Sequence, residues 1–293
     1  MNILVTGANG QVGYQLQQQL HSSDWNYTAL TRNQLDIADA KAVNEAIAQI
    51  KPDLVINAAA YTAVDKAEQE PELAYAINRD GPANLARAAK SVDAAIFHIS
   101  TDYVFAGDTP GCYTEDSATA PQGVYGKSKL AGEQALMSAN PKHLILRTAW
   151  VFGEHGNNFV KTMIRLGKSR DALGIVADQE GGPTYAGDIA SALLSIANHY
   201  ATNNPIAWGI YHFSGQPHTS WFHFAEHIFG EVALAGLYQK GIPQLNAIST
   251  AEYPTPAKRP ANSKLDCRKL EQVFGIAPSD WKLALKNIRA YSA

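Results

Sequence analysis

The chain of 293 residues has few of the features that mark secreted, membrane-spanning or nucleic-acid-binding proteins. Its two cysteines, Cys112 and Cys267, do not form a spaced metal or disulfide framework, which favours a reducing compartment, the cytoplasm. The 24 basic residues do not outnumber the 27 acidic ones, so no basic surplus points to nucleic acid or anionic lipid. No apolar run approaches the roughly 18 residues of a spanning helix, which argues against a membrane protein. Because residues 3–6 already form a strand that opens a motif, we expect no signal peptide.

Short apolar runs alternate with longer helical patterns in the first half of the chain. Strands separated by helices predict a parallel sheet with helices on both faces, an α/β fold of the doubly wound Rossmann type. The rhythm breaks after Trp150, where a smaller and less regular substrate-binding lobe begins. We expect a dinucleotide-binding domain over 1–150 and a lobe over 151–293 that is partly interwoven with it. The expected strands are 2–6, 26–30, 53–59, 94–100 and 143–150, and the expected helices are 11–20, 40–50, 72–91, 124–139, 159–167, 187–199, 221–237 and 281–290.

Three glycines follow the first strand in the segment "GANGQVG". Gly7 allows a tight turn out of the strand, Gly10 lets the backbone approach a pyrophosphate, and Gly13 lets the next helix pack close to the sheet. The free N–H groups at that helix start attract phosphate. A glycine-rich turn alone is weak evidence, but its place between a strand and a helix predicts dinucleotide binding.

The second strand ends at Leu30-Thr31-Arg32, where an NAD site would carry an acidic residue for the ribose hydroxyls. The guanidinium of Arg32 suits a 2′-phosphate instead, which favours NADPH over NADH. The alternative is that Arg32 is only a solvated loop charge. Asp36, next to Ile37, offers a carboxylate that could accept from the adenine amino group.

A tyrosine and a lysine stand four residues apart in the helical segment "GVYGKSKLAGEQAL". At that spacing Tyr125 and Lys129 share one helix face, about 6 Å apart along the axis. A nearby ammonium lowers the pKa of a phenol and makes it a useful proton donor near neutral pH. Such pairs are common on surface helices, but Thr101 at the end of the fourth strand adds a hydroxyl to the same predicted cleft. The small residues Ala58–Ala60 leave room for a nicotinamide to cross the strand tips.

These motifs together resemble the extended short-chain dehydrogenase/reductase family. The segments "NAAAYTAVDKAE", "STDYVFAG", "TAWVFGEHGNNFVKTM", "DQEGGPT" and "YPTPAKRPANSKLD" narrow the resemblance to its nucleotide-sugar reductases, over nearly the whole chain. The reaction that this resemblance implies is reduction of the 4-keto group of dTDP-4-dehydro-β-L-rhamnose by NADPH, or less favourably NADH. The product is dTDP-β-L-rhamnose, a precursor of surface polysaccharides such as the lipopolysaccharide O-antigen.

The resemblance also implies residue roles. Tyr125 would protonate the 4-oxygen, Lys129 would lower the Tyr125 pKa and hold the nicotinamide ribose, and Thr101 would hydrogen-bond the reacting oxygen. Cofactor contacts are implied for Gly10, Gln11, Val12, Asp36, Ile37, Ala60, Tyr61, Thr62 and the backbone beside Ile99; with the residues chosen above on their own chemistry, the predicted cofactor site also includes Gly7, Gly13, Arg32, Ala58, Ala59, Tyr125 and Lys129. The predicted substrate contacts are Thr101, Asp102, Tyr103, Tyr125, Trp150, Asn158 and Arg259.

Some members of the family place a glutamate just after the last glycine of the loop, as part of a magnesium-bridged dimer. This chain has Tyr14-Gln15-Leu16 there, so we predict no metal site, although a homodimer through other surfaces remains possible. The pair His223 and His227 does not have His-Glu-x-x-His order, and we interpret it as part of a packed aromatic helix.

Three other functions stay open at this point. Related dehydratases carry a glutamate after the Thr-Asp pair, where this chain has Tyr103. Related epimerases keep NAD bound and use the ribose acid that is missing here. A regulatory subunit of methionine adenosyltransferase resembles the family and acts as a binding partner rather than a reductase. Retention of Thr101, Tyr125 and Lys129 favours an enzyme.

Overall fold

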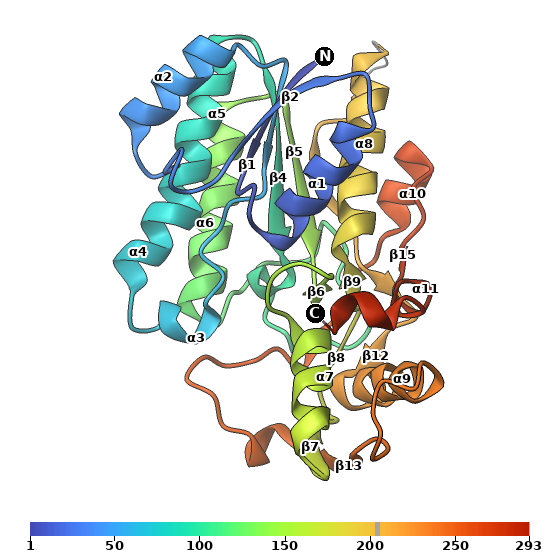
Figure 1. Ribbon diagram of the computed structural model, residues 1–293. Coiled ribbons are helices and arrows are strands. Elements are labelled where there is room, and N and C mark those ends of the chain that lie inside the picture. The colour runs from blue at the N-terminus through green and yellow to red at the C-terminus, as the bar shows by residue number, and fades with distance from the viewer. Residues whose placement is uncertain (203–205, 293) are drawn as a thin grey trace.

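The computed structural model describes residues 1–202 and 206–292, and its centre is a six-stranded parallel sheet (Figure 1). The chain adds β2 on one side of β1, and it then adds β3, β4, β5 and β10 on the other side. The glycine loop after β1 therefore lies at the switch point of the strand order, where open α/β sheets bind ligands. The fold prediction of a doubly wound Rossmann-type sheet is confirmed. In spatial order the strands are β2 (Asn26–Leu30), β1 (Asn2–Thr6), β3 (Leu54–Asn57), β4 (Ala95–Thr101), β5 (His143–Thr148) and β10 (Gly209–His212).

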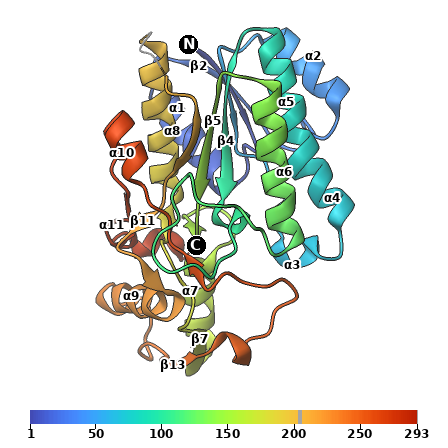
Figure 2. The same cartoon turned by 180° about the vertical axis from the view of Figure 1, so that it is seen from behind.

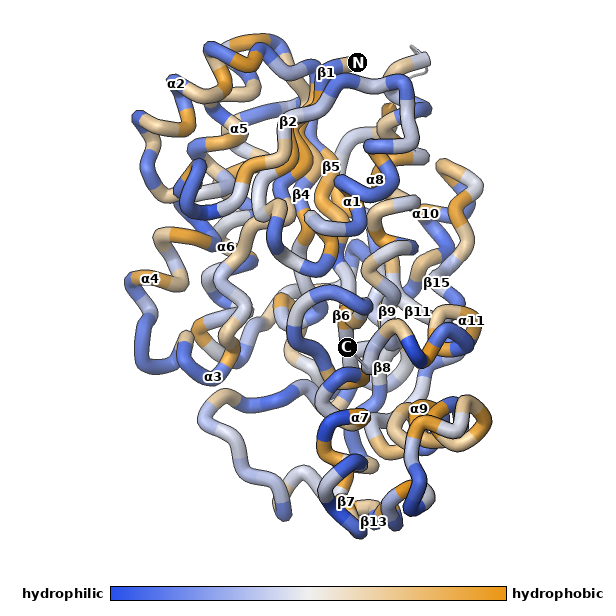
Figure 3. Tube along the Cα trace, in the orientation of Figure 1, coloured by the Kyte–Doolittle hydropathy of each residue, from blue (hydrophilic) through white to orange (hydrophobic). Residues whose placement is uncertain are grey.

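Helices cover both faces of this sheet, as the two opposite views show (Figures 1 and 2). Alternate residues of one strand face opposite layers: Ile3 and Val5 pack with α1 and α8, whereas Leu4 packs with the helices of the other face. Hydrophobic residues are accordingly concentrated along the central strands (Figure 3). One face carries α1 (Gln11–His21) and α8 (Ala186–Ala201), and the other α2 (Ala40–Ile50), α5 (Gly81–Ser91) and α6 (Val124–Ala139).

The helix predicted over 72–91 is not regular. It consists of α4 (Pro71–Tyr75), a π-helical turn (Ala76–Asp80) and α5, in one continuous run. The π turn lies close to α6: a Cβ added at Gly132 of α6 would stand only 1.9 Å from the Asn78 carbonyl oxygen. The wider turn therefore presents backbone and the Asn78 side chain to the helix that carries Tyr125.

The less regular part of the chain forms a second core below the carboxyl ends of the strands (Figure 1). Its aromatic centre includes Phe152, Phe224 and Trp281. The remaining elements are α3 (Val64–Ala67), α7 (Phe159–Ser169), α9 (Trp221–Leu234), α10 (Arg268–Phe274), α11 (Trp281–Leu285), β6 (Val151–Phe152), β7 (Ala172–Val176), β8 (Glu180–Gly181), β9 (Thr184–Tyr185), β11 (Gly215–Gln216), β12 (Thr219–Ser220), β13 (Gln244–Ile248), β14 (Asn262–Ser263), β15 (Ser279–Asp280) and three 3₁₀ turns (Asp102–Val104, Thr250–Glu252, Ile288–Tyr291).

Two helix predictions in this lobe were too long. The helix expected over 221–237 ends at Leu234, because Gly236 adopts a left-handed φ of 61° just beyond it. The helix expected over 281–290 ends at Leu285 and is followed by a separate 3₁₀ turn.

The chain after residue 150 also contributes to the sheet layers. α8 packs beside α1, β10 pairs with β5, and Leu270 of α10 joins the same core. The division into domains 1–150 and 151–293 stays a prediction. Among the residues that the structure describes, no helix is both long and apolar enough to cross a bilayer.

Candidate active site

A groove of about 320 Å³ lies at the carboxyl ends of β1, β2 and β3. The glycine loop forms one wall. Gly7 has a φ of 73°, which side chains disfavour, and a Cβ there would lie only 2.5 Å from the Ala59 nitrogen. Both the backbone conformation and the lack of space therefore require glycine. Gly13 is equally constrained, since its Cβ would approach the Gly7 oxygen to 2.1 Å. The predicted residues that the groove brings together are Gly7, Gly10, Arg32, Asp36, Ile37, Ala58, Ala59, Ala60, Tyr61 and Thr62, and Asn9, Leu35, Ala63 and Ile77 join them.

Arg32 stands at the rim of this groove. Its side chain is 62% exposed, and its Nε lies 3.9 Å from the Asp36 carboxylate, so the ion pair is loose. Both charged groups are thus free to turn toward a ligand in the groove. A guanidinium in this position suits a terminal phosphate on a ligand that lies in the groove.

Six predicted cofactor contacts do not line the groove. They are Gly13, which packs against Gly7, Tyr125 and Lys129, which are described below, and Val12, Gln11 and Ile99. Val12 is buried in the packing between α1 and the sheet. The Gln11 side chain accepts a hydrogen bond of 2.9 Å from the Asn158 amide, and it does not line the groove. The Ile99 carbonyl accepts a hydrogen bond of 2.7 Å from Lys129. Their proposed contacts with a cofactor stay predictions.

Tyr125, in the first turn of α6, packs beside one residue of the groove and one residue of a second cavity. It belongs to one hydrophobic cluster with Tyr61, which lines the groove, and it makes an edge-to-face contact with Tyr103 at 5.3 Å between ring centroids. Burial raises the pKa of Tyr125 to about 12, while a hydrogen bond with Thr101 acts in the opposite direction. We expected Lys129 to lower this pKa, but desolvation of the phenol dominates. The phenol is therefore firmly protonated at neutral pH.

Lys129 lies one turn further along α6 and is also buried. Its ammonium group donates to the Ile99 carbonyl and lies 3.3 Å from Nε2 of His98. Burial lowers the pKa of Lys129 to about 8, and the negative charge of Glu133 only partly offsets this. Lys129 thus changes charge much closer to neutrality than an exposed lysine does.

Several buried polar residues behind Tyr125 and Lys129 were not predicted from the sequence. Asn57 of β3 bonds to His98 of β4, and Asn78 bonds to Ser128 of α6 and to the backbone of Tyr61. Glu133 and Arg147 form a fully buried bidentate ion pair between α6 and β5. The available signal was the position of Asn57 and His98 near the carboxyl ends of adjacent strands, where polar side chains are unusual in a parallel sheet.

The second cavity has a volume of about 510 Å³ and lies between the sheet and the lower lobe. Trp150 lines this cavity, and its predicted contact with the substrate stays a prediction. The Trp150 backbone adopts a left-handed φ of 50°, and its ring stacks on Trp221 at 3.5 Å between centroids. The cavity lining includes Tyr103, Trp150, Arg259, Pro260 and Ser263, with Asp65, Phe159, Met163, Leu166, Arg170, Leu173, Ile175, Gln179, Trp221, Tyr253 and Thr255.

Charged and polar groups are concentrated where this cavity approaches Tyr125. Arg259 forms an ion pair of 2.6 Å with Asp65, which holds the cation against the wall. Asp102 is buried beside Thr101 and accepts a hydrogen bond of 2.5 Å from Ser263. Burial raises the pKa of Asp102 to about 6, although these hydrogen bonds favour its ionised form. The cavity thus offers a cation and buried acceptors close to a protonated phenol.

Asn158 does not lie in this cavity. Its side-chain oxygen caps α7 by accepting from the Lys161 N–H, and its amide donates to Gln11 and Gly153. Asn158 was predicted to contact the substrate, whereas the structure places it in the contact between α7 and α1. Its predicted contact with the substrate stays untested.

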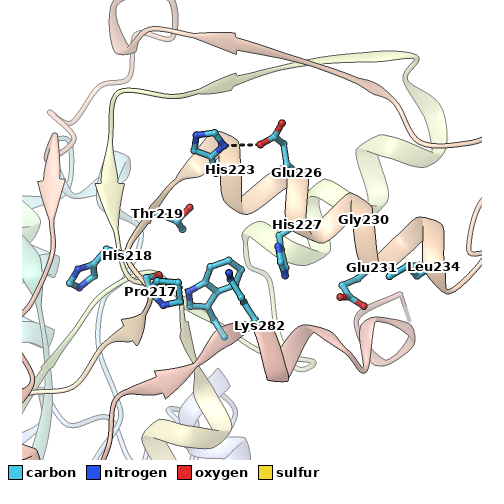
Figure 4. Close-up of a pocket in the computed structure, with 11 residues that line it drawn as sticks. Pro217, His218, Thr219, His223, Glu226, His227, Gly230, Glu231, Leu234 and Lys282 are labelled. Carbon is cyan, nitrogen blue, oxygen red and sulfur yellow. Dashed lines mark hydrogen bonds and ion pairs between the residues drawn. The ribbon is translucent and has the colours of Figure 1, made fainter.

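The histidine pair of α9 lines a different pocket (Figure 4). His223 bonds to Glu226 at 2.7 Å, and His227 lies edge-on to Trp281. None of the residues that line this pocket lines the groove or the cavity described above. The pair therefore takes no part in the chemistry around Tyr125.

Comparison with known proteins identifies the family to which this architecture belongs. A family model described as the RmlD substrate binding domain matches residues 1–292. The chain belongs to the RmlD family. One curated member, a dTDP-4-dehydrorhamnose reductase of Aggregatibacter actinomycetemcomitans, is 53% identical over 291 residues, covering 99% of each chain. RmlD-family enzymes act on nucleotide sugars as oxidoreductases.

Solved structures of RmlD-family proteins share the whole fold. The crystal structure of a dTDP-4-dehydrorhamnose reductase from Clostridium acetobutylicum has a TM-score of 0.91 at 43% identity and covers 98% of both chains. That of Bacillus anthracis, solved in complex with NADP, has a TM-score of 0.89 at 38% identity and covers 98% of this chain and 97% of its own. The similarity extends over both the sheet and the lower lobe.

Proposed function

We propose that this chain is an NADPH-dependent reductase that converts dTDP-4-dehydro-β-L-rhamnose into dTDP-β-L-rhamnose. The observation that carries the proposal is the position of Tyr125, a protonated phenol between a dinucleotide-type groove and a cavity with a cation in its wall. The full-length relatives named as dTDP-4-dehydrorhamnose reductases support the same reaction.

In this mechanism Tyr125 donates its proton to the 4-oxygen of the sugar. A pKa of about 12 keeps the phenol protonated until that oxygen gains negative charge. Thr101, which is hydrogen-bonded to Tyr125, orients the same oxygen. Lys129 lies on the same helix face, and in its protonated form it stabilises the phenolate that remains.

The groove has the features that NADPH requires. The glycine loop and Ala58–Ala60 leave the backbone accessible, and Arg32 at the rim provides a cation for the 2′-phosphate. When bound, the dinucleotide supplies the hydride for the 4-carbon. NADH lacks the 2′-phosphate, so we propose it as a weaker alternative.

The cavity has the features that a nucleotide sugar requires. Trp150 offers an apolar face to the sugar ring and Tyr103 offers a polar group, while Asp102 is bonded to Ser263 of the cavity wall. Arg259 offers a cation for the diphosphate. We also propose the cytoplasm as the compartment, which suits the free thiols of Cys112 and Cys267, and a homodimer as a possible assembly.

The proposal is tested by following NADPH oxidation with the purified protein and dTDP-4-dehydro-β-L-rhamnose, with identification of the sugar product. We expect one NADPH to be consumed for each dTDP-rhamnose formed, and slower oxidation of NADH. An epimerase would change the sugar without net NADPH consumption. A regulatory subunit would bind the ligands without turnover, and either result would reject the reductase function.

A further inference from the structure

His98 is held by hydrogen bonds that fix which of its nitrogens carries a proton. The Asn57 side-chain oxygen accepts from the Ala59 N–H at 3.0 Å, and a backbone N–H can only donate. The oxygen also accepts from the Thr6 hydroxyl at 2.7 Å. The Asn57 amide group must therefore point the other way, and it donates to Nδ1 of His98 at 2.9 Å.

An imidazole nitrogen that accepts a hydrogen bond carries no proton. Neutral His98 must then carry its proton on Nε2, the atom that faces the Lys129 side-chain nitrogen at 3.3 Å. His98 is fully buried, and burial keeps its pKa well below the usual range, so the neutral ring is the relevant form. An N–H of His98 thus points at Lys129.

Two donors face one another when Lys129 is an ammonium, because an ammonium has no lone pair. When Lys129 is a neutral amine, its lone pair accepts the Nε2–H of His98 while one of its own N–H groups still donates to the Ile99 carbonyl. The hydrogen-bond geometry of His98 therefore favours the uncharged form of Lys129, and burial of Lys129 acts in the same direction.

We propose that His98 is a positioning residue that, held as the Nε2–H tautomer by Asn57, stabilises the neutral amine of Lys129. The lysine then releases a proton near neutral pH rather than acting as a permanent cation. In that step one N–H bond of the ammonium breaks, its proton leaves to solvent, and the lone pair left on nitrogen accepts the His98 hydrogen bond. The proposal rests on the proposed function only in placing Lys129 in the reductase site.

Other charged groups around Lys129 act in the opposite sense or are already paired. Glu133, one turn further along α6, favours the ammonium, but it is bonded to Arg147 of β5. Asp102 on the 3₁₀ turn acts on Tyr125, and its buried carboxyl has a raised pKa. β3 contributes the uncharged Asn57, and the π turn contributes the uncharged Asn78. His98 is thus the group in contact with Lys129 that favours the amine.

A second buried histidine provides a matched control. His212 on β10 is fully buried, and burial lowers its pKa to about 3, but its Nδ1 bonds to the Tyr113 carbonyl, which can only accept. His212 must therefore have the opposite tautomer, and its bonding partners do not include Lys129. Replacing it removes a buried histidine of the same sheet without changing the lysine's contacts.

The tautomers are measured by ¹⁵N NMR of the imidazole nitrogens in the full-length protein without ligands. We expect an unprotonated Nδ1 and a protonated Nε2 for His98, and the reverse for His212. A proton on Nδ1 of His98 would overturn the proposal. This readout is independent of the substrate, so it remains decisive even if the proposed reductase function fails.

The effect on Lys129 is measured by titrating its ¹³Cε signal, which is assigned from the spectrum of the Lys129→Met variant. A glutamine side chain reaches as far as Nε2 of the histidine and can turn its oxygen toward the Lys129 ammonium. The His98→Gln variant should therefore raise the midpoint of the Lys129 titration by about one pH unit or more. The high-pH limb of kcat should shift in the same direction. His212→Gln should leave both unchanged.

Equal midpoints in the wild-type protein and the His98→Gln variant would refute the role of His98. A similar shift in both histidine variants would also refute it, because the effect would then be a general response to sheet substitutions. If the His98→Gln variant fails to fold, the ¹⁵N measurement on the wild-type protein decides the question.

Discussion

The groove proposed for the cofactor and the cavity proposed for the substrate are built in different ways. The groove is formed by residues 7–77, and glycines and alanines make up much of its wall. The cavity draws on residues from Asp65 to Ser263, and its walls are large aromatic rings and an ion pair between Arg259 and Asp65. A dinucleotide can therefore be recognised by a short local motif, whereas recognition of the sugar nucleotide depends on segments that only the completed fold brings together.

The largest effect is expected where the two regions meet. Tyr125→Phe removes the proton donor while leaving the ring and its contact with Tyr103 in place. We expect turnover to fall by about a hundredfold or more, with NADPH affinity unchanged. Steady-state kinetics together with fluorescence titration of NADPH measure the two quantities. Unchanged turnover would remove Tyr125 from the role of acid.

A change confined to the cavity should leave the groove intact. Arg259→Ala removes the cation beside Asp65, and we expect KM for the nucleotide sugar to rise by about thirtyfold. NADPH affinity should not change. Arg165→Ala, at an exposed arginine of α7 outside the cavity, is the matched control. A rise in the NADPH dissociation constant would show that the two regions are not independent.

A change confined to the groove should have a smaller effect. Arg32→Ala should weaken NADPH by about tenfold and leave NADH nearly unchanged, because only NADPH carries the 2′-phosphate. Direct titration of both dinucleotides measures the difference, with Lys41→Ala on the nearby α2 as a control. Equal losses for NADPH and NADH would identify Arg32 as a general surface charge.

The smallest effect concerns stability at the boundary of the two regions. Burial lowers the folded-state pKa of Lys129 from 10.5 to about 8, so the charged lysine costs stability below pH 8. Lys129→Met should raise the free energy of unfolding at pH 7 by about 1–2 kcal/mol, less than the full shift because the bond to Ile99 is lost.

The pH dependence of the Lys129→Met effect tests whether the stability change comes from the buried charge. The gain in the free energy of unfolding should shrink as the pH rises from 8 towards 10.5, because the wild-type lysine then loses its charge in the unfolded chain as well. Urea unfolding at several pH values measures this trend. A gain that persisted undiminished at high pH would indicate better packing rather than relief of a buried charge.

Local patterns predicted most of the sheet. The runs at 2–6 and 26–30 became strands with those bounds, because short β-branched runs between helices have few alternatives in a parallel sheet. Gly7 and Gly13 were predictable for a similar reason, since close backbone approach leaves no room for a Cβ. The π turn was not, because a helix with one wider turn has nearly the same hydrophobic pattern as a regular one.

The electrostatic character of the site was harder to predict. The spacing of Tyr125 and Lys129 placed them on one helix face, but it could not reveal that burial dominates the pKa of each. Asn158 and Arg259 were both predicted to contact the substrate. Only the fold separates them, since the Asn158 side chain is used between α7 and α1 whereas Arg259 lines the cavity.

The π turn at Ala76–Asp80 has a consequence for insertions and deletions. Each residue of an α-helix turns the chain by about 100°, so removal of one residue here would restore a regular helix and rotate everything on one side of the cut. Asn78 would then swing away from Ser128 and from the Tyr61 backbone that it now joins. The length of this stretch is therefore under tighter constraint than the identity of its exposed residues, and a single-codon deletion would do more harm there than most substitutions.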